Sequence, residues 1–184
     1  MINFLRHNLV ASILLTIARV YLGFNWMMDG YGKLTSKPAF SAAGLINGAI
    51  KGGVQNVAPA KGQMYPLWTA FLKTMTNGGK NTQLFDFLVK WGELLVGIAL
   101  ILGAFTLFAA FAAILMNYSF MLSGVVSINP IYILLEFFIL IGGFNSAKIG
   151  LDRFITPWLR KNIPFLRKHG ETEVRIENAI NSYK

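Results

Sequence analysis

Long apolar runs, broken by short polar stretches, occupy most of this chain. Four runs approach the roughly 20 residues that cross a bilayer as an α-helix, and they cover residues 8–28, 84–102, 107–123 and 130–147. Only four residues separate the second run from the third, so these two runs form a tight antiparallel hairpin. The pattern predicts an all-α integral membrane protein built as a four-transmembrane-helix bundle.

The first run has to be compared with a secretory signal peptide, because it follows the basic residues Arg6 and His7. Arg19 interrupts the apolar stretch, and no pair of small residues typical of a cleavage site follows it. We interpret the run as a retained transmembrane helix. Pro130 suits the first turn of the fourth helix, where its missing N–H would have no partner in any case.

The segment 29–83, between the first two spans, is too long for a simple connection, and its pattern predicts short helices at 41–51 and 66–76. The second of these has one apolar face, which either rests on the bilayer or the bundle or acts as a lid over a substrate.

Residues 151–184 follow the transmembrane domain 1–150 as a basic amphipathic tail. Its first part has apolar residues at helical spacing, which is typical of an interfacial helix, and Pro157 either kinks this helix or starts a new one. The polar stretch 171–184 is expected to be loosely ordered or docked on a partner.

The composition supports a membrane protein. Hydrophobic residues make up 54% of the 184 residues and charged ones 14%, and the mean hydropathy of +0.51 nearly excludes a soluble domain. The chain has 17 Lys and Arg residues but only 8 Asp and Glu residues. Because the cationic residues flank the spans, we interpret them as determinants of membrane orientation and contacts with lipid headgroups, and we expect no nucleic-acid partner. Positive charges close to the ends of spans favour the cytoplasmic side. The arginine-bearing tail and Arg6 carry such charges, whereas the lysines of segment 29–83 are scattered over a long loop. We therefore predict a multi-pass protein of the cell membrane with both termini cytoplasmic.

Several cofactors are excluded by the residue types present. The chain has no cysteine, which rules out disulfides, thiol catalysis and iron-sulfur ligation. His7 and His169 lie outside the spans, so we expect no haem, and no histidine cluster suggests a metal. Redox chemistry would therefore have to come from a ligand or a partner.

Two ionisable residues lie halfway through the first two spans. Placing the charged side chains of Arg19 and Glu93 in a bilayer costs free energy unless each has a partner. Because the two spans run antiparallel, we expect these side chains to meet at equal depth. Either they form a buried ion pair that fixes the helix register, or they line a cavity.

The remaining polar residues of the spans gather in the half of the bundle next to segment 29–83, which is the predicted outer half. This bias predicts a polar cavity for an amphipathic molecule, partly covered by that segment. The aromatic residues near it either contribute to the site or belong to the interfacial belt. The candidates besides Arg19 and Glu93 are Asn25, Trp26, Asp29, Lys33, Lys90, Trp91, Asn117 and Glu136.

Three motifs resemble the DoxX/DoxD family of four-helix membrane proteins. They read RVYLGFNWMMDGYGKL (19–34), WGELLVGIALILGAFT (91–106) and GGFNSAKIGLDRF (142–154), and they stand in the order of that family. The positions that match its pattern are Arg19, Gly23, Gly30, Lys33, Glu93, Gly97, Gly103, Gly150, Leu151 and Asp152.

DoxD-like proteins are membrane subunits of thiosulfate:quinone oxidoreductase, so the resemblance implies a quinone-linked redox subunit. It implies that Arg19 or Asn25 donates a hydrogen bond to a quinone carbonyl and that Glu93 or Glu136 supplies a proton, with the other candidates around the quinone. The best-known form of that enzyme has a second subunit or domain, which this chain lacks.

A second, non-enzymatic class fits the same sequence. In that class the protein binds membrane lipid, or anchors a partner complex or forms a homo-oligomer or larger membrane complex through its basic tail. A quinone retained by the purified protein would favour the first class, and a tightly co-purifying protein without quinone the second.

Overall fold

A computed structural model describes residues 1–51 and 65–163 of the chain. These residues form α-helices and no strands. The helices are α1 (Ile2–His7), α2 (Leu9–Thr35), α3 (Ala43–Lys51), α4 (Pro66–Met75), α5 (Gln83–Leu102), α6 (Thr106–Leu122), α7 (Asn129–Gly142), α8 (Phe144–Ala147) and α9 (Asp152–Asn162).

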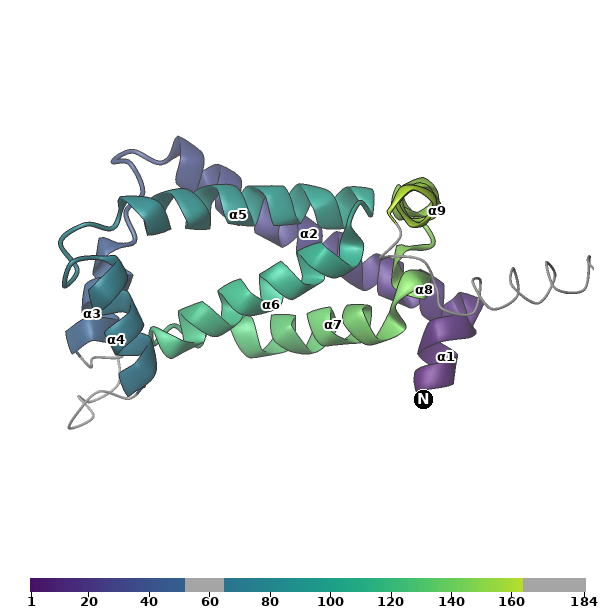
Figure 1. Ribbon diagram of the computed structural model, residues 1–184, viewed down its shortest axis with the longest axis horizontal. Helices are drawn as coiled ribbons and strands as arrows, with labels where there is room; N and C mark the ends of the chain where they lie inside the picture. The colour runs from purple at the N-terminus through teal and green to yellow at the C-terminus, as the bar shows by residue number, and fades with distance from the viewer. Residues whose placement is uncertain (52–64, 164–184) are drawn as a thin grey trace, which may run out of the picture.

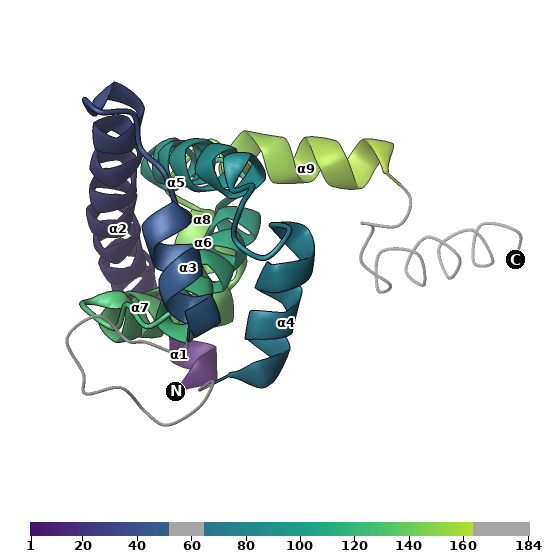
Figure 2. The same cartoon turned by 90° about the vertical axis from the view of Figure 1, so that its left-hand side faces the viewer.

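Four helices, α2, α5, α6 and α7, run along the long axis of the molecule (Figure 1). At one end lie α3 and α4, and at the other lie α1, α8 and α9. We call these the α3/α4 end and the α9 end. Seen along the long axis, α9 projects sideways from the bundle (Figure 2).

Each apolar run predicted from the sequence forms a helix, and so do the two short segments between the first two runs and the amphipathic start of the tail. Pro157 lies inside α9, so it does not start a new helix. The stretch 171–184 and the central part of segment 29–83 lie outside the described residues.

Two boundaries differ from the prediction. The first helix continues beyond residue 28 to Thr35, and its last turns bring Lys33 to Glu93 of α5. The fourth run was expected to be one helix to residue 147, which is wrong: it stops at Gly142. Gly143 has a φ of 57°, a value that ends a helix readily only at glycine. A separate short helix, α8, follows it.

The backbones of α2 and α5 approach closely at glycines. A methyl group on Gly30 would lie 2.8 Å from Cα of Leu94, and one on Gly97 would lie 2.6 Å from Cα of Met27. Real Cβ atoms do not come that close, so only glycine fits, as is common where helices pack within membranes. These contacts fix the antiparallel register of the two helices.

The turn between α5 and α6 is held by the segment that precedes α9. The carboxylate of Asp152 accepts hydrogen bonds from the backbone N–H groups of Phe105 and Thr106, both at 2.7 Å. These are N–H groups at the start of α6 that have no partner inside the helix. The guanidinium of Arg19 donates to the carbonyl oxygen of Ile149 at 2.5 Å and lies 3.4 Å from Oγ1 of Thr106. We call this arrangement the Arg19–Asp152 junction.

The distribution of side chains is the opposite of that in a soluble bundle. Many large apolar side chains of the four long helices point outward, whereas Arg19, Glu93, Asn117 and Glu136 are almost completely buried. By length and composition α2 is the one described helix that qualifies to cross a membrane, and α6 and α7 are shorter apolar helices. The 20-residue α5 carries Asp86, Lys90 and Glu93.

The close α2–α5 contact predicts that Gly30→Ala destabilises the protein, because the added methyl group would overlap the backbone of α5. We expect a loss of roughly 1–3 kcal/mol, the usual cost of overpacking, measured by thermal unfolding in detergent. Gly32→Ala is the matched control, since it lies in the same helix with open space around it. It should leave the melting temperature unchanged or raise it slightly, and equal losses in the two variants would contradict the tight contact.

Candidate functional site

A polar pocket of about 190 Å³ lies inside the bundle toward the α3/α4 end. Side chains from α2, α5, α6 and α7 line it, together with residues of the α6–α7 turn. The charged and amide side chains and the indole that contribute are Trp26, Asp29, Lys33, Glu93, Asn117 and Asn129. Five of the ten predicted site residues therefore meet in one cavity.

An ion pair between α2 and α5 forms part of the pocket wall. The ammonium group of Lys33 lies 2.5 Å from Oε2 of Glu93, and the side chains are 27% and 2% exposed. Lys33 reaches this position because it lies in the last turns of α2, beside the glycine contact with α5, and its ammonium group also lies 5.7 Å from the ring centre of Phe40. The ammonium group of Lys33 thus neutralises the buried carboxylate of Glu93, and both groups line the pocket.

A second buried carboxylate, Glu136, lies behind the pocket lining. It accepts one hydrogen bond from the indole N–H of Trp26 at 3.0 Å and two from the amide nitrogen of Asn117, both at 2.9 Å. All three side chains are nearly inaccessible to solvent. Glu136 therefore fixes the orientation of two side chains that do line the pocket, Trp26 and Asn117.

The amide of Asn117 has unused hydrogen-bonding capacity. The residue is 1% exposed, and its Oδ1 atom has no hydrogen-bond partner among the described residues. Because Nδ2 is committed to Glu136, the acceptor atom that remains for a pocket ligand is Oδ1. A buried carbonyl oxygen left unpaired costs free energy, which a ligand bearing an O–H or N–H group would relieve.

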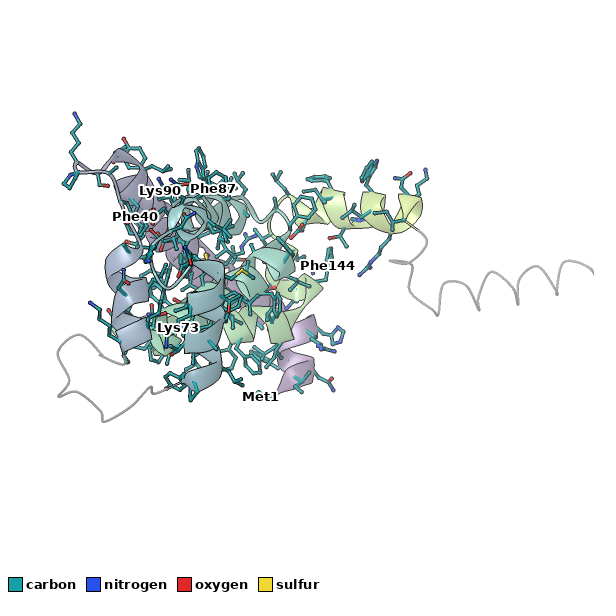
Figure 3. All side chains as sticks on the ribbon, turned by 60° about the vertical axis from the view of Figure 1, so that its left-hand side comes forward. Met1, Phe40, Lys73, Phe87, Lys90 and Phe144 are labelled. Atoms are coloured by element: carbon teal, nitrogen blue, oxygen red, sulfur yellow. The ribbon has the colours of Figure 1, made fainter. Side chains whose placement is uncertain are left out.

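Besides Glu136, four of the predicted site residues lie outside the lining of this pocket. The side chain of Asn25 donates to the carbonyl oxygen of Tyr21 in its own helix at 2.8 Å. Lys90 lies toward the outer side of α5 near Phe87 (Figure 3), and Trp91 is an exposed residue whose ring packs against that same phenylalanine. Arg19 belongs to the Arg19–Asp152 junction at the α9 end.

The expected contact between Arg19 and Glu93 is wrong. Arg19 lies level with the α5–α6 turn, where it bonds Ile149 and Thr106, whereas Glu93 lies beside Gly30 and pairs with Lys33. The prediction assumed that the midpoints of the apolar runs meet. Because α2 continues to Thr35, the register that the glycines impose shifts Arg19 toward the far end of α5.

Sequence reasoning missed several residues of the pocket. Phe120, Ser127, Asn129 and Tyr132 line it from the end of α6, the α6–α7 turn and the start of α7. Asn129 next to Pro130 marks the start of a helix, which is a local signal of a turn near the site. Phe120 lies within an uninterrupted apolar run, where nothing distinguishes it from a lipid-facing residue.

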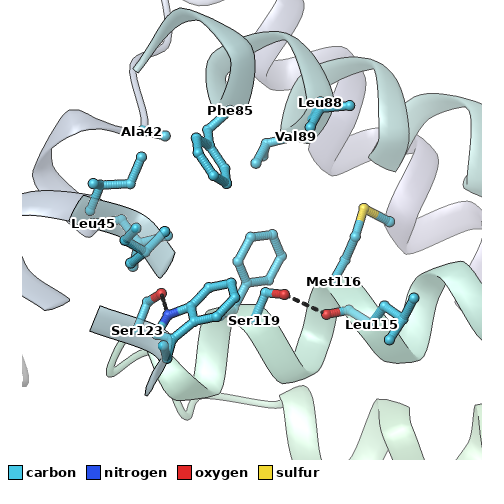
Figure 4. A pocket seen from close by; sticks show the side chains of 13 residues that line it. Ala42, Leu45, Phe85, Leu88, Val89, Leu115, Met116, Ser119 and Ser123 are labelled. Atoms are coloured by element: carbon cyan, nitrogen blue, oxygen red, sulfur yellow. Dashed lines mark hydrogen bonds between the residues drawn. The ribbon is translucent and has the colours of Figure 1, made fainter. Parts of the chain in front are cut away.

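A second pocket, of about 180 Å³ and mainly apolar, lies between α5 and α6 (Figure 4). Leu45 and Ile46 of α3 and Trp68 and Leu72 of α4 close it. The two short helices predicted to cover the polar cavity thus contribute to this apolar pocket and not to the described lining of the polar one. Phe120 lines both pockets.

The family model of DoxX matches residues 14–124 of this chain, a range that contains α2 except for its first five residues and all of α3, α4, α5 and α6, and therefore most of both pockets. No curated protein and no solved structure matches the chain.

The geometry predicts which charged residues are energetically coupled. In a double-mutant cycle, Lys33→Met and Glu93→Gln should show an interaction energy of roughly 0.5–3 kcal/mol, because they remove the same ion pair. Arg19→Gln combined with Glu93→Gln should be additive within about 0.5 kcal/mol, since these residues have no common partner. Thermal or denaturant unfolding in detergent measures both cycles, and strong coupling between Arg19 and Glu93 would refute the register described above.

Proposed function

Because this chain belongs to the DoxX family, a family of membrane proteins, we propose that it is a multi-pass membrane protein that binds a quinone and serves as a quinone-linked redox subunit. The observation that carries the proposal is the buried polar pocket, with the Lys33–Glu93 ion pair in its wall and the unpaired Oδ1 atom of Asn117.

The outward-facing surface of the bundle supports four membrane spans formed by α2, α5, α6 and α7. Each of these helices exposes large apolar side chains, which water would not favour and lipid would. They include Ile17 and Phe24 on α2, Leu95 on α5, Phe108 and Phe111 on α6, and Leu134 and Phe137 on α7. The three ionisable groups of α5 are compatible with a span because Glu93 is buried against Lys33 and the other two lie in its first turns.

We propose that the α9 end faces the cytoplasm, with both termini on that side. Arg6, Lys148 and Arg153 lie close to the ends of the spans there, where positive charge has most influence on orientation. The polar pocket then lies in the outer half of the bundle.

The pocket residues fit the headgroup of a quinone. An apolar cavity of about 150 Å³ holds a benzene ring, so the pocket of about 190 Å³ has room for a ring of that size with small substituents. Trp26 and Phe120 supply aromatic surface, and the Lys33 ammonium group supplies a hydrogen-bond donor. Asn117 Oδ1 supplies an acceptor for the hydroxyl group of the reduced form.

The roles of the carboxylates follow from their places. Glu93, on the pocket wall, is the group we assign to proton exchange with the bound ring, and Lys33 holds it there. Glu136 is a positioning residue, because it contacts Trp26 and Asn117 and lies behind the lining. We assign Arg19 a positioning role as well, since it joins α2 to the α5–α6 turn.

When bound, a quinone supplies the acceptor of two electrons and two protons. The electrons would come from thiosulfate, two molecules of which release two electrons when a new S–S bond joins them. A second subunit would oxidise the thiosulfate. This chain has no cysteine to carry sulfur, and we assign its polar pocket to the quinone headgroup.

One observation favours the non-enzymatic class of function, in which the protein anchors a partner. Helix α9 leaves Phe154 and Trp158 72% and 64% exposed, and it also carries Arg153, Arg160 and Lys161. Such a helix binds at a membrane surface or holds a partner protein. This role is compatible with quinone binding, since α9 lies at one end of the bundle (Figure 1) and the pocket is lined by the last turns of α2 and the α6–α7 turn at the other end.

The proposed topology predicts the sidedness of single cysteines, which the cysteine-free chain makes simple to test. Lys73→Cys, on the surface of α4 (Figure 3), should react with a membrane-impermeant maleimide in intact cells. Arg153→Cys in α9 should react only after the cells are opened. The reverse pattern would invert the orientation, and labelling of both positions in intact cells would contradict four spans.

The proposed site predicts saturable binding of a water-soluble benzoquinone without a side chain to the detergent-solubilised protein, followed by tryptophan fluorescence or calorimetry. The corresponding hydroquinone should bind as well, and Asn117→Leu should weaken hydroquinone binding by roughly three- to tenfold, the value of one neutral hydrogen bond, because only the reduced form has an O–H group to donate to Oδ1. Val125→Trp should block the pocket from its exposed rim and weaken the binding of both forms.

Asn25→Leu is the matched control, because the amide of Asn25 is bonded within its own helix and lies outside the pocket lining. It should bind with the parent affinity. If the benzoquinone does not bind, or if Asn117→Leu leaves the hydroquinone affinity and Val125→Trp the affinity for both forms unchanged while the melting temperature shows intact protein, the pocket is not the quinone site. The anchoring function then becomes the better account.

A further inference from the structure

The two pockets meet at one aromatic side chain. Phe120 lines the polar pocket together with Trp26, and it also lines the apolar pocket between α5 and α6. The rings of Trp26 and Phe120 are in contact, with centres 6.4 Å apart and planes inclined by 32°. A molecule in the polar pocket is therefore separated from the apolar pocket by a single layer of side chain.

The apolar pocket has little to offer water. Its lining is aliphatic and aromatic except for two serines, and both hydroxyl groups are occupied (Figure 4). Ser119 donates to the carbonyl oxygen of Leu115 at 2.7 Å, and Ser123 accepts from the indole N–H of Trp68 at 2.9 Å. Because an enclosed water needs several polar partners, an apolar group is the better occupant.

We propose that the apolar pocket receives the hydrocarbon chain of the molecule whose polar headgroup lies in the polar pocket, with the chain passing Phe120. The inference rests on the proposed function, because it takes the polar pocket as the headgroup site. It adds the class of ligand: an amphipathic molecule with an apolar chain, held inside the protein and not only in the surrounding lipid.

The short helices α3 and α4 gain a role from this arrangement. Leu45 and Ile46 of the first and Trp68 and Leu72 of the second close the apolar pocket at the end of the bundle. The hydrogen bond from Trp68 to Ser123 ties α4 to the end of α6. These helices therefore cover the chain of the ligand, and its headgroup is selected by α2, α5, α6 and α7.

Affinity alone would test this poorly, because a hydrocarbon chain leaving lipid or detergent gains little by entering another apolar environment. Position is the sharper measurement. The probe is a 2,3-dimethoxy-5-methyl-benzoquinone with a decyl chain that ends in an alkyl diazirine. After photolysis with the detergent-solubilised full chain, mass spectrometry locates the adducts, and the same quinone without a chain serves as competitor.

The expected adducts lie on residues of the apolar pocket, such as Leu72, Val89 and Met116. Excess chainless quinone should lower their yield by about tenfold, because it occupies the headgroup site. Ser119→Trp, which fills the apolar pocket, should lower it similarly while leaving the affinity for chainless quinone unchanged. Tyr118→Trp is the matched control, since the neighbouring residue on α6 is exposed and outside the pocket lining, and it should label as the parent does.

Three results would overturn the inference. Adducts on outward-facing residues such as Phe108 and Phe111 would place the chain in lipid. Adducts in the apolar pocket that chainless quinone does not suppress would separate that pocket from the headgroup site. Absence of chainless quinone binding would remove the proposed function and this inference together, whereas normal chainless binding with unaltered labelling in Ser119→Trp would remove the inference alone.

Discussion

The close approach of α2 to α5 is the constraint on which the positions of the buried charges depend. At Gly30 and Gly97 one backbone lies directly against the other, so neither helix can slide or rotate without a clash. That register brings Lys33 of α2 beside Glu93 of α5. It equally brings Arg19, more than three turns earlier in α2, to the far end of α5. The same helix contact therefore places Lys33 at the polar pocket and Arg19 at the Arg19–Asp152 junction.

The polar pocket and the junction lie at opposite ends of the bundle. At the α9 end, Asp152 satisfies two N–H groups at the start of α6 and Arg19 bonds the carbonyl oxygen of Ile149, although Nε of Arg19 has no hydrogen-bond partner among the described residues. The polar pocket differs because Asn117, with its unpaired acceptor, and the Lys33–Glu93 pair both line a cavity. An unpaired polar group at a cavity is the place where a ligand adds hydrogen bonds.

Local pattern predicted the helices well, because each apolar run or amphipathic stripe is decided by neighbours in the chain. The break at Gly143 was missed, since an apolar run does not reveal a glycine in the left-handed region. The contact between Arg19 and Glu93 was wrong for another reason: equal depth between helices depends on register, which glycines far apart in sequence determine. Residues such as Trp26, Asn117 and Glu136 were recognisable as polar or amphipathic groups in apolar runs, whereas Phe120 acts only through its place between two pockets.

The two buried glutamates show why burial alone does not identify a reactive group. Glu136 is the more deeply buried, yet its hydrogen bonds come from Trp26 and Asn117, and it has no place in the pocket lining. Replacing it would disturb the site through those two side chains even if it never touched a ligand. Glu93 contacts the cavity directly and is paired with Lys33, which lines the same cavity. In the proposed function, the carboxylate that exchanges a proton with a bound molecule is therefore Glu93, which lines the cavity, and Glu136 is the support that orients the amide of Asn117.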